Sequence, residues 1–99
     1  MKRAIVSREA EADIDQITEY TTKAWGSLQT DRYLDQLEDS FQILAEHPFI
    51  GRSCEELQSG LRRYESGRHV VFYRVLRDGI RVVRVLHQQK IPIKPQFES

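Results

Sequence analysis

The chain has 99 residues with 15 Lys or Arg and 15 Asp or Glu, so its formal net charge is zero. A chain of this length makes one small domain, expected over residues 1–99. Its modest core disfavours a deep, enclosed active site and favours function at an exposed surface. Residues 1–48 hold five basic and ten acidic side chains, whereas residues 49–99 hold ten basic and five acidic ones. A basic half predicts an anionic partner, either an acidic protein segment or a nucleic acid.

The number and spacing of cysteine and histidine residues limit which metal, cofactor and disulfide sites are possible, and the apolar runs limit the cellular location. Cys54 is the only cysteine, so no disulfide can form within the chain, and no histidine stands at metal-ligand spacing from it. There is no glycine-rich phosphate loop. We therefore predict neither a metal nor a cofactor. No N-terminal run resembles a signal peptide and no segment is long enough to span a membrane, so we expect a cytoplasmic protein without membrane contact.

The first half of the sequence predicts a short strand followed by two helices. Residues 3–7 are β-prone, and Ser7 can cap a helix whose first turn contains Glu9 and Glu11, where the helix dipole favours anions. Gly26 ends this helix. A second helix starts near residues 27–30 and ends at the His-Pro pair at 47–48, because proline disfavours helical geometry in the residue before it. The short joint predicts an antiparallel helical hairpin.

Apolar residues recur at three- and four-residue steps in both helices, so each helix has one apolar stripe. The repeating positions are Ala10, Ile14, Ile17, Thr21 and Ala24 in the first helix and Tyr33, Leu37, Phe41 and Leu44 in the second.

The second half predicts a loop over residues 49–60 and strands at 61–65, 68–77 and 80–87. Asp78-Gly79 is a strong hairpin signal, because both turn positions need positive φ. A two-residue turn there pairs Val75 with Val82 and Tyr73 with Arg84. The order β-α-α-β-β-β predicts an α+β fold in which a helical hairpin packs against a mostly antiparallel three-stranded sheet that the N-terminal strand joins.

Both faces of the two long strands are largely apolar, so both need a cover. Two helices can cover one face only. The other face should therefore stay partly exposed and dotted with arginine, and such a surface is usually an interaction site. In the predicted register Arg81 and His87 share this uncovered face. His69 and His87 come near each other but point to opposite faces, which argues against zinc binding.

Arginine, histidine and tyrosine on an exposed sheet could also cleave RNA, which needs a base, an acid and cations for the transition state. His87 would be the base, Arg81 or Lys90 would supply charge, and Tyr73 would be a weak acid. Tyr73 is more simply explained as a core aromatic residue. For Arg84 a structural and a functional role are equally open, because an arginine on a helix-covered face needs a carboxylate or backbone partner.

Five stretches of the sequence resemble the ParE branch of the ParE/RelE toxin superfamily. They are SREAEADIDQI (7–17), LAEHPFIGR (44–52), GLRRY (60–64), HVVFYRV (69–75) and RVLHQQ (84–89). The resemblance covers nearly the whole chain. It implies the toxin of a type II toxin–antitoxin pair, bound by a ParD-like antitoxin whose C-terminal segment folds onto it. ParE-type toxins are thought to poison DNA gyrase without being hydrolases, whereas RelE-type relatives cleave mRNA on the ribosome.

The C-terminal part of the chain departs from the RNA-cleaving relatives. These commonly have several basic residues and a tyrosine near the C-terminus, whereas here the last tyrosine is Tyr73, inside a predicted strand, and Phe97 cannot transfer a proton. The resemblance therefore favours a gyrase inhibitor with no catalytic residues. If the chain is instead a RelE-like, ribosome-dependent mRNA endonuclease, the candidate catalytic residues are Arg81, His87 and Lys90.

A third alternative is an inactive toxin that serves only as an antitoxin-binding corepressor. Gln88 and Gln89 stand where many ParE relatives have charged residues, which is the hint for this alternative. We expect the target to bind at the end of the last strand, through His87, Gln88, Gln89 and Lys90.

We expect the antitoxin to bind on the sheet face that the helices leave uncovered. A disordered tail that folds on binding needs an apolar groove and charged anchors. The candidate anchors for an acidic tail are Arg62, Arg63, Arg68, Arg74 and Arg81. Two or three of these five should prove to be solvated arginines. The complex with the antitoxin would be a hetero-oligomer, and we expect no direct, sequence-specific DNA binding by this chain.

Overall fold

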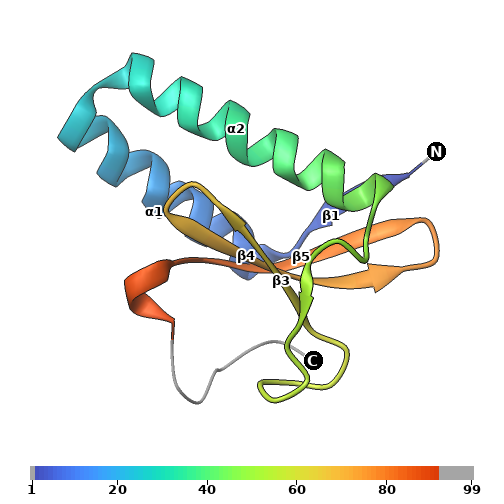
Figure 1. The fold of residues 1–99 in the computed structure, drawn as a ribbon. Coiled ribbons are helices and arrows are strands. Elements are labelled where there is room, and N and C mark those ends of the chain that lie inside the picture. Colours follow the sequence, from blue (N-terminus) through green and yellow to red (C-terminus); the bar gives the residue numbers. More distant parts are fainter. Residues whose placement is uncertain (1, 92–99) are drawn as a thin grey trace.

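A computed structural model, which describes residues 2–91, shows a helical hairpin packed on one face of a five-stranded sheet (Figure 1). The elements are β1 (Arg3–Val6), α1 (Arg8–Trp25), α2 (Ser27–Glu46), β2 (Arg52–Ser53), β3 (Arg62–Ser66), β4 (His69–Leu76), β5 (Gly79–His87) and the 3₁₀ turn η1 (Gln88–Lys90). The strand order is β1-β5-β4-β3-β2, with β1 parallel to β5 and the other pairs antiparallel. The predicted α+β class and element order are confirmed, but the sheet has more strands than expected, because part of the predicted loop forms β2.

Ser7 connects the start of α1 to the sheet. Its side-chain oxygen accepts the amide hydrogen of Ala10 at 3.0 Å, as expected of an N-cap, and donates to the carbonyl of Val83 on β5 at 2.8 Å. At the other end of α1, Gly26 has a φ of 89°, in the left-handed region that favours glycine. Because α2 begins at the next residue, the two helices fold back on each other as an antiparallel pair.

The main core lies between the helical hairpin and the sheet. Its large buried members would each gain about 1.5–3 kcal/mol from burial. The buried residues are Ala10, Ile17, Leu37, Phe41, Leu44, Ala45, Val71, Tyr73, Ile80, Val82 and Val85. The predicted stripe of α2 supplies Leu37, Phe41 and Leu44 to this core. The predicted stripe of α1 supplies Ala10 and Ile17 but does not extend to its end, because Ala24 is exposed.

The β4–β5 hairpin has a different register from the predicted one. Val75 pairs with Ile80 and Tyr73 pairs with Val82. The predicted pairs of Val75 with Val82 and Tyr73 with Arg84 are therefore wrong. Tyr73 nevertheless faces the helices as a core aromatic residue, because pairing with Val82 places it on the helix-covered face.

Gly79 explains the altered turn. Leu76 pairs with Gly79, so the turn consists of Arg77 and Asp78, and Gly79 is the first residue of β5. A Cβ atom at position 79 would overlap the backbone of Arg3 in β1. This glycine is therefore required by the close approach of β1, which the turn signal in the sequence does not reveal.

A bulge in β5 then changes the faces of the following residues. Tyr73 pairs with Val82 and Phe72 with Arg84, so Val83 is the extra residue. As a result His69 pairs directly with His87, and their ring centroids lie 5.3 Å apart. The prediction that the two histidines point to opposite faces is wrong.

The second face of the sheet is partly covered by the chain itself. The segment between β2 and β3 folds back beneath the sheet (Figure 1), closed by hydrogen bonds that include Cys54 N to Leu61 O at 2.8 Å. A second cluster of buried residues forms there, consisting of Cys54, Leu61, Val70, Phe72 and Val83, with Leu57, Leu86 and Ile91 packed against it. The expectation that this face stays open is therefore wrong where the segment lies.

Candidate partner-binding site

Arg84 pairs with Asp13 of α1. Its Nε lies 2.7 Å from one carboxylate oxygen and its Nη2 lies 2.9 Å from the other, while the amide of Val85 donates to the same carboxylate at 2.9 Å. The hydrogen bond that Arg84 donates to the Asp13 carboxylate raises the pKa of Arg84. This pair holds α1 against the bulge of β5, so the role of Arg84 is structural. The sequence carries one sign of this pair, because the carboxylate of Asp13 lies within the apolar stripe of α1.

Tyr73 holds the segment before β2. Its buried hydroxyl donates to the carbonyl of Pro48 at 2.7 Å and accepts from the amide of Gly51 at 3.1 Å. A Cβ at Gly51 would overlap this hydroxyl and lie 2.6 Å from the carbonyl oxygen of Arg63, so only glycine fits. The tyrosine and the HPFIGR stretch, far apart in the sequence, are thus parts of one structural contact.

Two of the five candidate antitoxin anchors hold the chain's own loops. Arg62 donates from Nη2 to the carbonyls of Phe49 at 3.1 Å and Gly51 at 2.5 Å, and its guanidinium lies 5.3 Å from the Phe49 ring centroid. Arg74 donates to the carbonyl of Ser59 at 2.6 Å and to the side chain of Gln58. Both guanidinium groups are therefore already engaged.

The other three candidate anchors do not form one patch with these two. Arg63 follows Arg62 in β3 and so points to the opposite face, where its guanidinium lies 5.7 Å from the Phe72 ring centroid. Arg68 is exposed in the turn between β3 and β4, and Arg81 is partly buried on β5.

The alternative catalytic residues Arg81 and His87 are not brought together. They lie six positions apart on one strand, about 20 Å at roughly 3.3 Å per residue. The bulge also places Arg81 on the loop-covered face and His87 on the helix-covered face, so the expectation that they share a face is wrong. Lys90 ends η1, but its side chain lies outside the described residues, as does Phe97.

The other predicted target-binding residues lie beside the turn between β3 and β4. The amide of Gln88 donates to the carbonyl of Arg68 at 3.1 Å, and its side chain donates to the carbonyl of Gly67 at 3.2 Å. The amide of Gln89 donates to Nδ1 of His87 at 3.2 Å. Both glutamine side chains are exposed, so they remain accessible to a partner.

Tyr33 of α2 joins this region in a way that the sequence does not reveal. Its hydroxyl lies 2.5 Å from Nδ1 of His69 and accepts from the amide of Arg68 at 3.0 Å. Burial, with a smaller contribution from the adjacent His87, lowers the pKa of His69 to about 4. The imidazole of His69 is therefore neutral at pH 7, and the cluster anchors α2 to the sheet.

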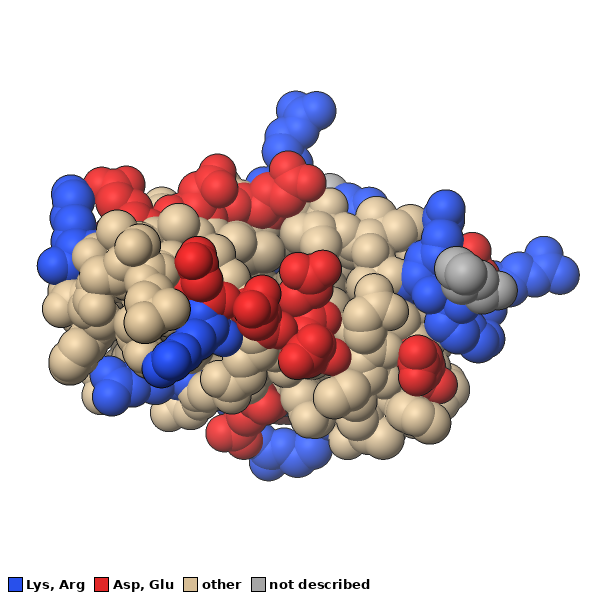
Figure 2. Space-filling view, turned by 90° about the horizontal axis from the view of Figure 1, so that it is seen from above, with Lys and Arg blue, Asp and Glu red and all other residues tan. Residues whose placement is uncertain are grey.

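The helical face of the molecule is mainly acidic (Figure 2) and also contains an apolar groove. The helical layer carries the acidic half of the sequence, and Figure 2 shows acidic side chains across the middle of this face and basic ones mainly at its margins. An apolar groove of about 360 Å³ runs between β1 and the helices. Its lining residues are Ala4, Val6, Ile14, Leu34, Leu37, Glu38, Phe41 and Gln42.

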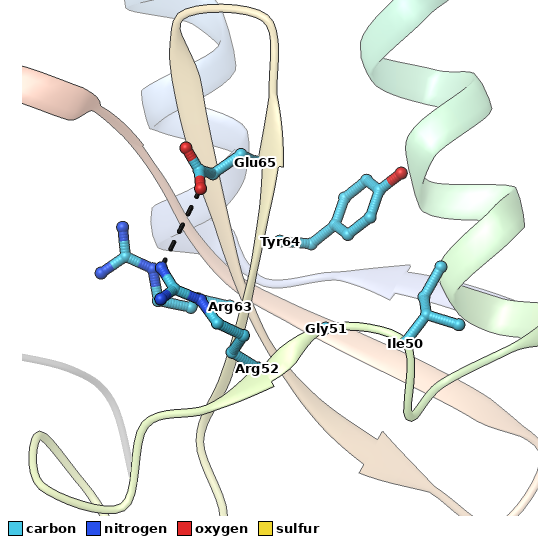
Figure 3. A pocket seen from close by; sticks show the side chains of 6 residues that line it. All are labelled: Ile50, Gly51, Arg52, Arg63, Tyr64 and Glu65. Carbon is cyan, nitrogen blue, oxygen red and sulfur yellow. Dashed lines mark ion pairs between the residues drawn. The ribbon is translucent and has the colours of Figure 1, made fainter.

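A pocket of about 240 Å³ lies at the other edge of the sheet, where β2 pairs with β3 (Figure 3). Its lining residues are Ile50, Gly51, Arg52, Arg63, Tyr64 and Glu65. Within residues 2–91, no group of three or more His, Cys, Asp or Glu side chains could hold a metal ion, and no helix has the length and apolar character of a membrane span.

Comparison with known proteins decides the family. Residues 4–92 match the family described as the ParE toxin of the type II toxin–antitoxin system, parDE. This chain belongs to the ParE toxin family. The resemblance seen in the sequence motifs is therefore confirmed.

Named relatives agree with this assignment. Toxin ParE1 of Caulobacter vibrioides is 47% identical over 90 residues, which cover 89% of this chain and 91% of that toxin. Toxin ParE1 of Mycobacterium tuberculosis is 41% identical over 88 residues, which cover 88% of this chain and 90% of that toxin. A solved chain from a chromosomal ParDE system of P. aeruginosa has a TM-score of 0.75 at 20% identity, covering 88% of this chain and 96% of its own length, and so supports the fold.

Proposed function

We propose that this ParE family member inhibits DNA gyrase without hydrolysing a substrate and that a ParD-like antitoxin neutralises it. The observation that supports this most is the position of Tyr73. A ribosome-dependent endonuclease needs an accessible proton donor beside its base and its cations. The hydroxyl of Tyr73 is buried and bound on both sides by the chain's own backbone, at Pro48 and Gly51.

The distribution of the other candidate groups also disfavours RNA cleavage. Arg84 is paired with Asp13, and Arg81 and His87 lie on different faces of the sheet. General acid–base catalysis requires its groups within hydrogen-bond reach of one substrate. The described residues therefore fit a protein that acts by binding, with His87, Gln88 and Gln89 at the end of β5 as the proposed contacts to gyrase.

The antitoxin would bind surfaces that the chain leaves uncovered. The groove between β1 and the helices offers apolar area that a folding tail needs, and Arg63 and Arg68 are proposed anchors for its carboxylates. The complex would be a hetero-oligomer. Because gyrase acts on chromosomal DNA, the proposal places the protein in the cytoplasm.

A supercoiling assay with purified gyrase tests the proposal. We expect micromolar toxin to abolish supercoiling and the cognate antitoxin to restore it. Gyrase that remains fully active, together with growth arrest and new transcript 5′ ends on induction, would instead identify an endonuclease. Antitoxin binding without growth arrest would identify a corepressor. Replacing His87 by alanine should weaken gyrase inhibition, whereas replacing the exposed Arg77 should not.

A further inference from the structure

We propose that Arg52 and Arg63 form a carboxylate-binding site for an acidic, extended segment of the antitoxin, bound along the β2 edge of the sheet. This inference rests on the proposed function only in taking the antitoxin as the source of that segment.

The two arginines are cross-strand neighbours. Arg52 of β2 pairs in register with Arg63 of β3, so both side chains lie on the same side of the strand pair (Figure 3). Like charges directly opposite each other in a sheet are destabilising unless an anion lies between them. A carboxylate bound by two guanidinium groups removes this repulsion and gains charge-assisted hydrogen bonds.

The hydrogen-bonding groups of this pair are not fully used. Nε of Arg63 is buried without a hydrogen-bond partner among the described residues, as are the Nε atoms of Arg62 and Arg74, so the donors that Arg63 can offer to an incoming carboxylate are its terminal Nη groups. The ring of Phe72 lies beneath its guanidinium, at 5.7 Å, and limits how far that side chain can turn away. Nη2 of Arg52 lies 3.9 Å from Glu65, in a pair whose side chains are 73% and 60% exposed. This distance is too long for a hydrogen bond, so Glu65 satisfies the two arginines only weakly.

The surroundings favour a peptide over a nucleic acid. Glu65 lowers the local charge, and the neighbouring Arg62 and Arg74 are engaged with loop carbonyls, so a continuous row of free cations for a phosphate backbone is lacking among these residues. Instead, the site combines two cations with apolar surface, because Ile50 is 52% exposed beside it.

The edge geometry fits an extended chain. β2 is the last strand of the sheet, so within residues 2–91 its outer side pairs with no other strand. Figure 3 shows Arg52, Arg63 and Glu65 on one side of the strand pair and Ile50 and Tyr64 on the other. Successive side chains of an extended segment point alternately to the two sides. A segment that alternates acidic and apolar residues would therefore meet the arginines on one side and Ile50 on the other.

A synthetic peptide of alternating valine and glutamate tests the site directly, with fluorescence anisotropy as the readout. We expect binding to wild type, a loss of about tenfold or more in affinity for Arg52→Gln, and no change for Arg77→Gln, an exposed arginine in the β4–β5 turn. Glu65→Gln should bind the peptide a few-fold more tightly, because it removes the competing carboxylate. Arg52 is highly exposed, so its substitution should leave the fold intact, and an unchanged melting temperature checks this.

Several outcomes would overturn the inference. These are an absence of peptide binding, equal losses for the Arg52 and Arg77 variants, or tighter binding of a single-stranded RNA oligonucleotide than of the peptide. In the gyrase assay, Arg52→Gln should inhibit as wild type does but need about tenfold more antitoxin for neutralisation. Unchanged neutralisation would overturn the site and leave the proposed function standing, whereas wild-type protein without effect on gyrase would overturn the proposed function alone.

Discussion

Replacing Asp13 by alanine should remove a large part of the protein's stability. The substitution deletes two hydrogen bonds to the guanidinium of Arg84, of 2.7 and 2.9 Å, and one to the amide of Val85, of 2.9 Å. Asp13 is 9% exposed, and the side chain of Arg84 is 27% exposed. The arginine would therefore stay in a partly buried position without its counter-charge, and the amide would lose its acceptor.

The magnitude follows from this partial burial. Removing one member of a buried ion pair typically costs about 3–5 kcal/mol. Because part of Arg84 reaches water, we expect a loss of about 2–4 kcal/mol in the free energy of unfolding. For a domain of this size each kcal/mol shifts the melting temperature by roughly 4–8 °C, so Tm should fall by about 8–30 °C in a circular dichroism melt.

Asp15→Ala is the matched control, because Asp15 is an exposed carboxylate on the same helix. Its effect should stay within about 0.5 kcal/mol. The double variant Asp13→Ala, Arg84→Met should recover part of the loss, since a buried pair can be replaced by apolar side chains at little cost. An Asp13→Ala variant that melts like the Asp15→Ala variant would refute the structural role of the pair.

Three other changes probe the contacts around the sheet. Gly51→Ala should lower the free energy of unfolding in urea by about 2–4 kcal/mol, because the added Cβ overlaps the buried side chain of Tyr73. Gly26→Ala is the control and should cost about 1 kcal/mol, since the space around Gly26 is open. Equal costs for the two variants would contradict the steric argument. The pKa of His69 is about 4 in the folded protein and has an ordinary value of 6.5. Between these pH values the unfolded chain binds more protons than the folded one, so the contribution of His69 to stability should be complete above pH 6.5 and be lost on acidification. After allowance for partial exposure, we expect the free energy of unfolding to fall by about 1–2 kcal/mol between pH 6.5 and pH 4. His69→Gln should flatten this pH profile, and an unaltered profile would argue against His69 as its source. Arg74→Ala should loosen the loop that covers Cys54. A thiol reagent should then label Cys54 at least about tenfold faster than in wild type, at an almost unchanged Tm. Equal labelling rates in variant and wild type would show that Arg74 does not hold this loop.

The element order could be predicted from local signals, whereas the register could not. Ser7 as a helix cap and Gly26 as a helix end depend on residues close in sequence, and both act as predicted. The register of β4 and β5 depends instead on the packing of β1 against Gly79 and on the bulge at Val83, which α1 contacts through Ser7. Such contacts between distant segments leave no periodic pattern in the sequence.

The same limit applies to the candidate site. Charge counting identified the arginines but not their partners, because Arg62 and Arg74 bind backbone carbonyls, and every residue has a carbonyl. The pairing of Asp13 with Arg84 had a usable signal, a carboxylate within an apolar stripe. Arg52 had none, because the two-residue strand that places it beside Arg63 is too short to show alternation.

The pairing of β1 with β5 has a consequence for synthesis on the ribosome. The contact between Ser7 and Val83 spans 76 positions, so the first strand must wait for the last one before the sheet can close. Until then the hairpin of α1 and α2 lacks β5, so its apolar side is incompletely covered, and nascent chains in this condition are open to chaperones and proteases. A translation product cut short before β5 would lack both the strand that joins β1 to the rest of the sheet and the partner of Asp13, so an interrupted message should yield a degradable fragment rather than a weakened toxin.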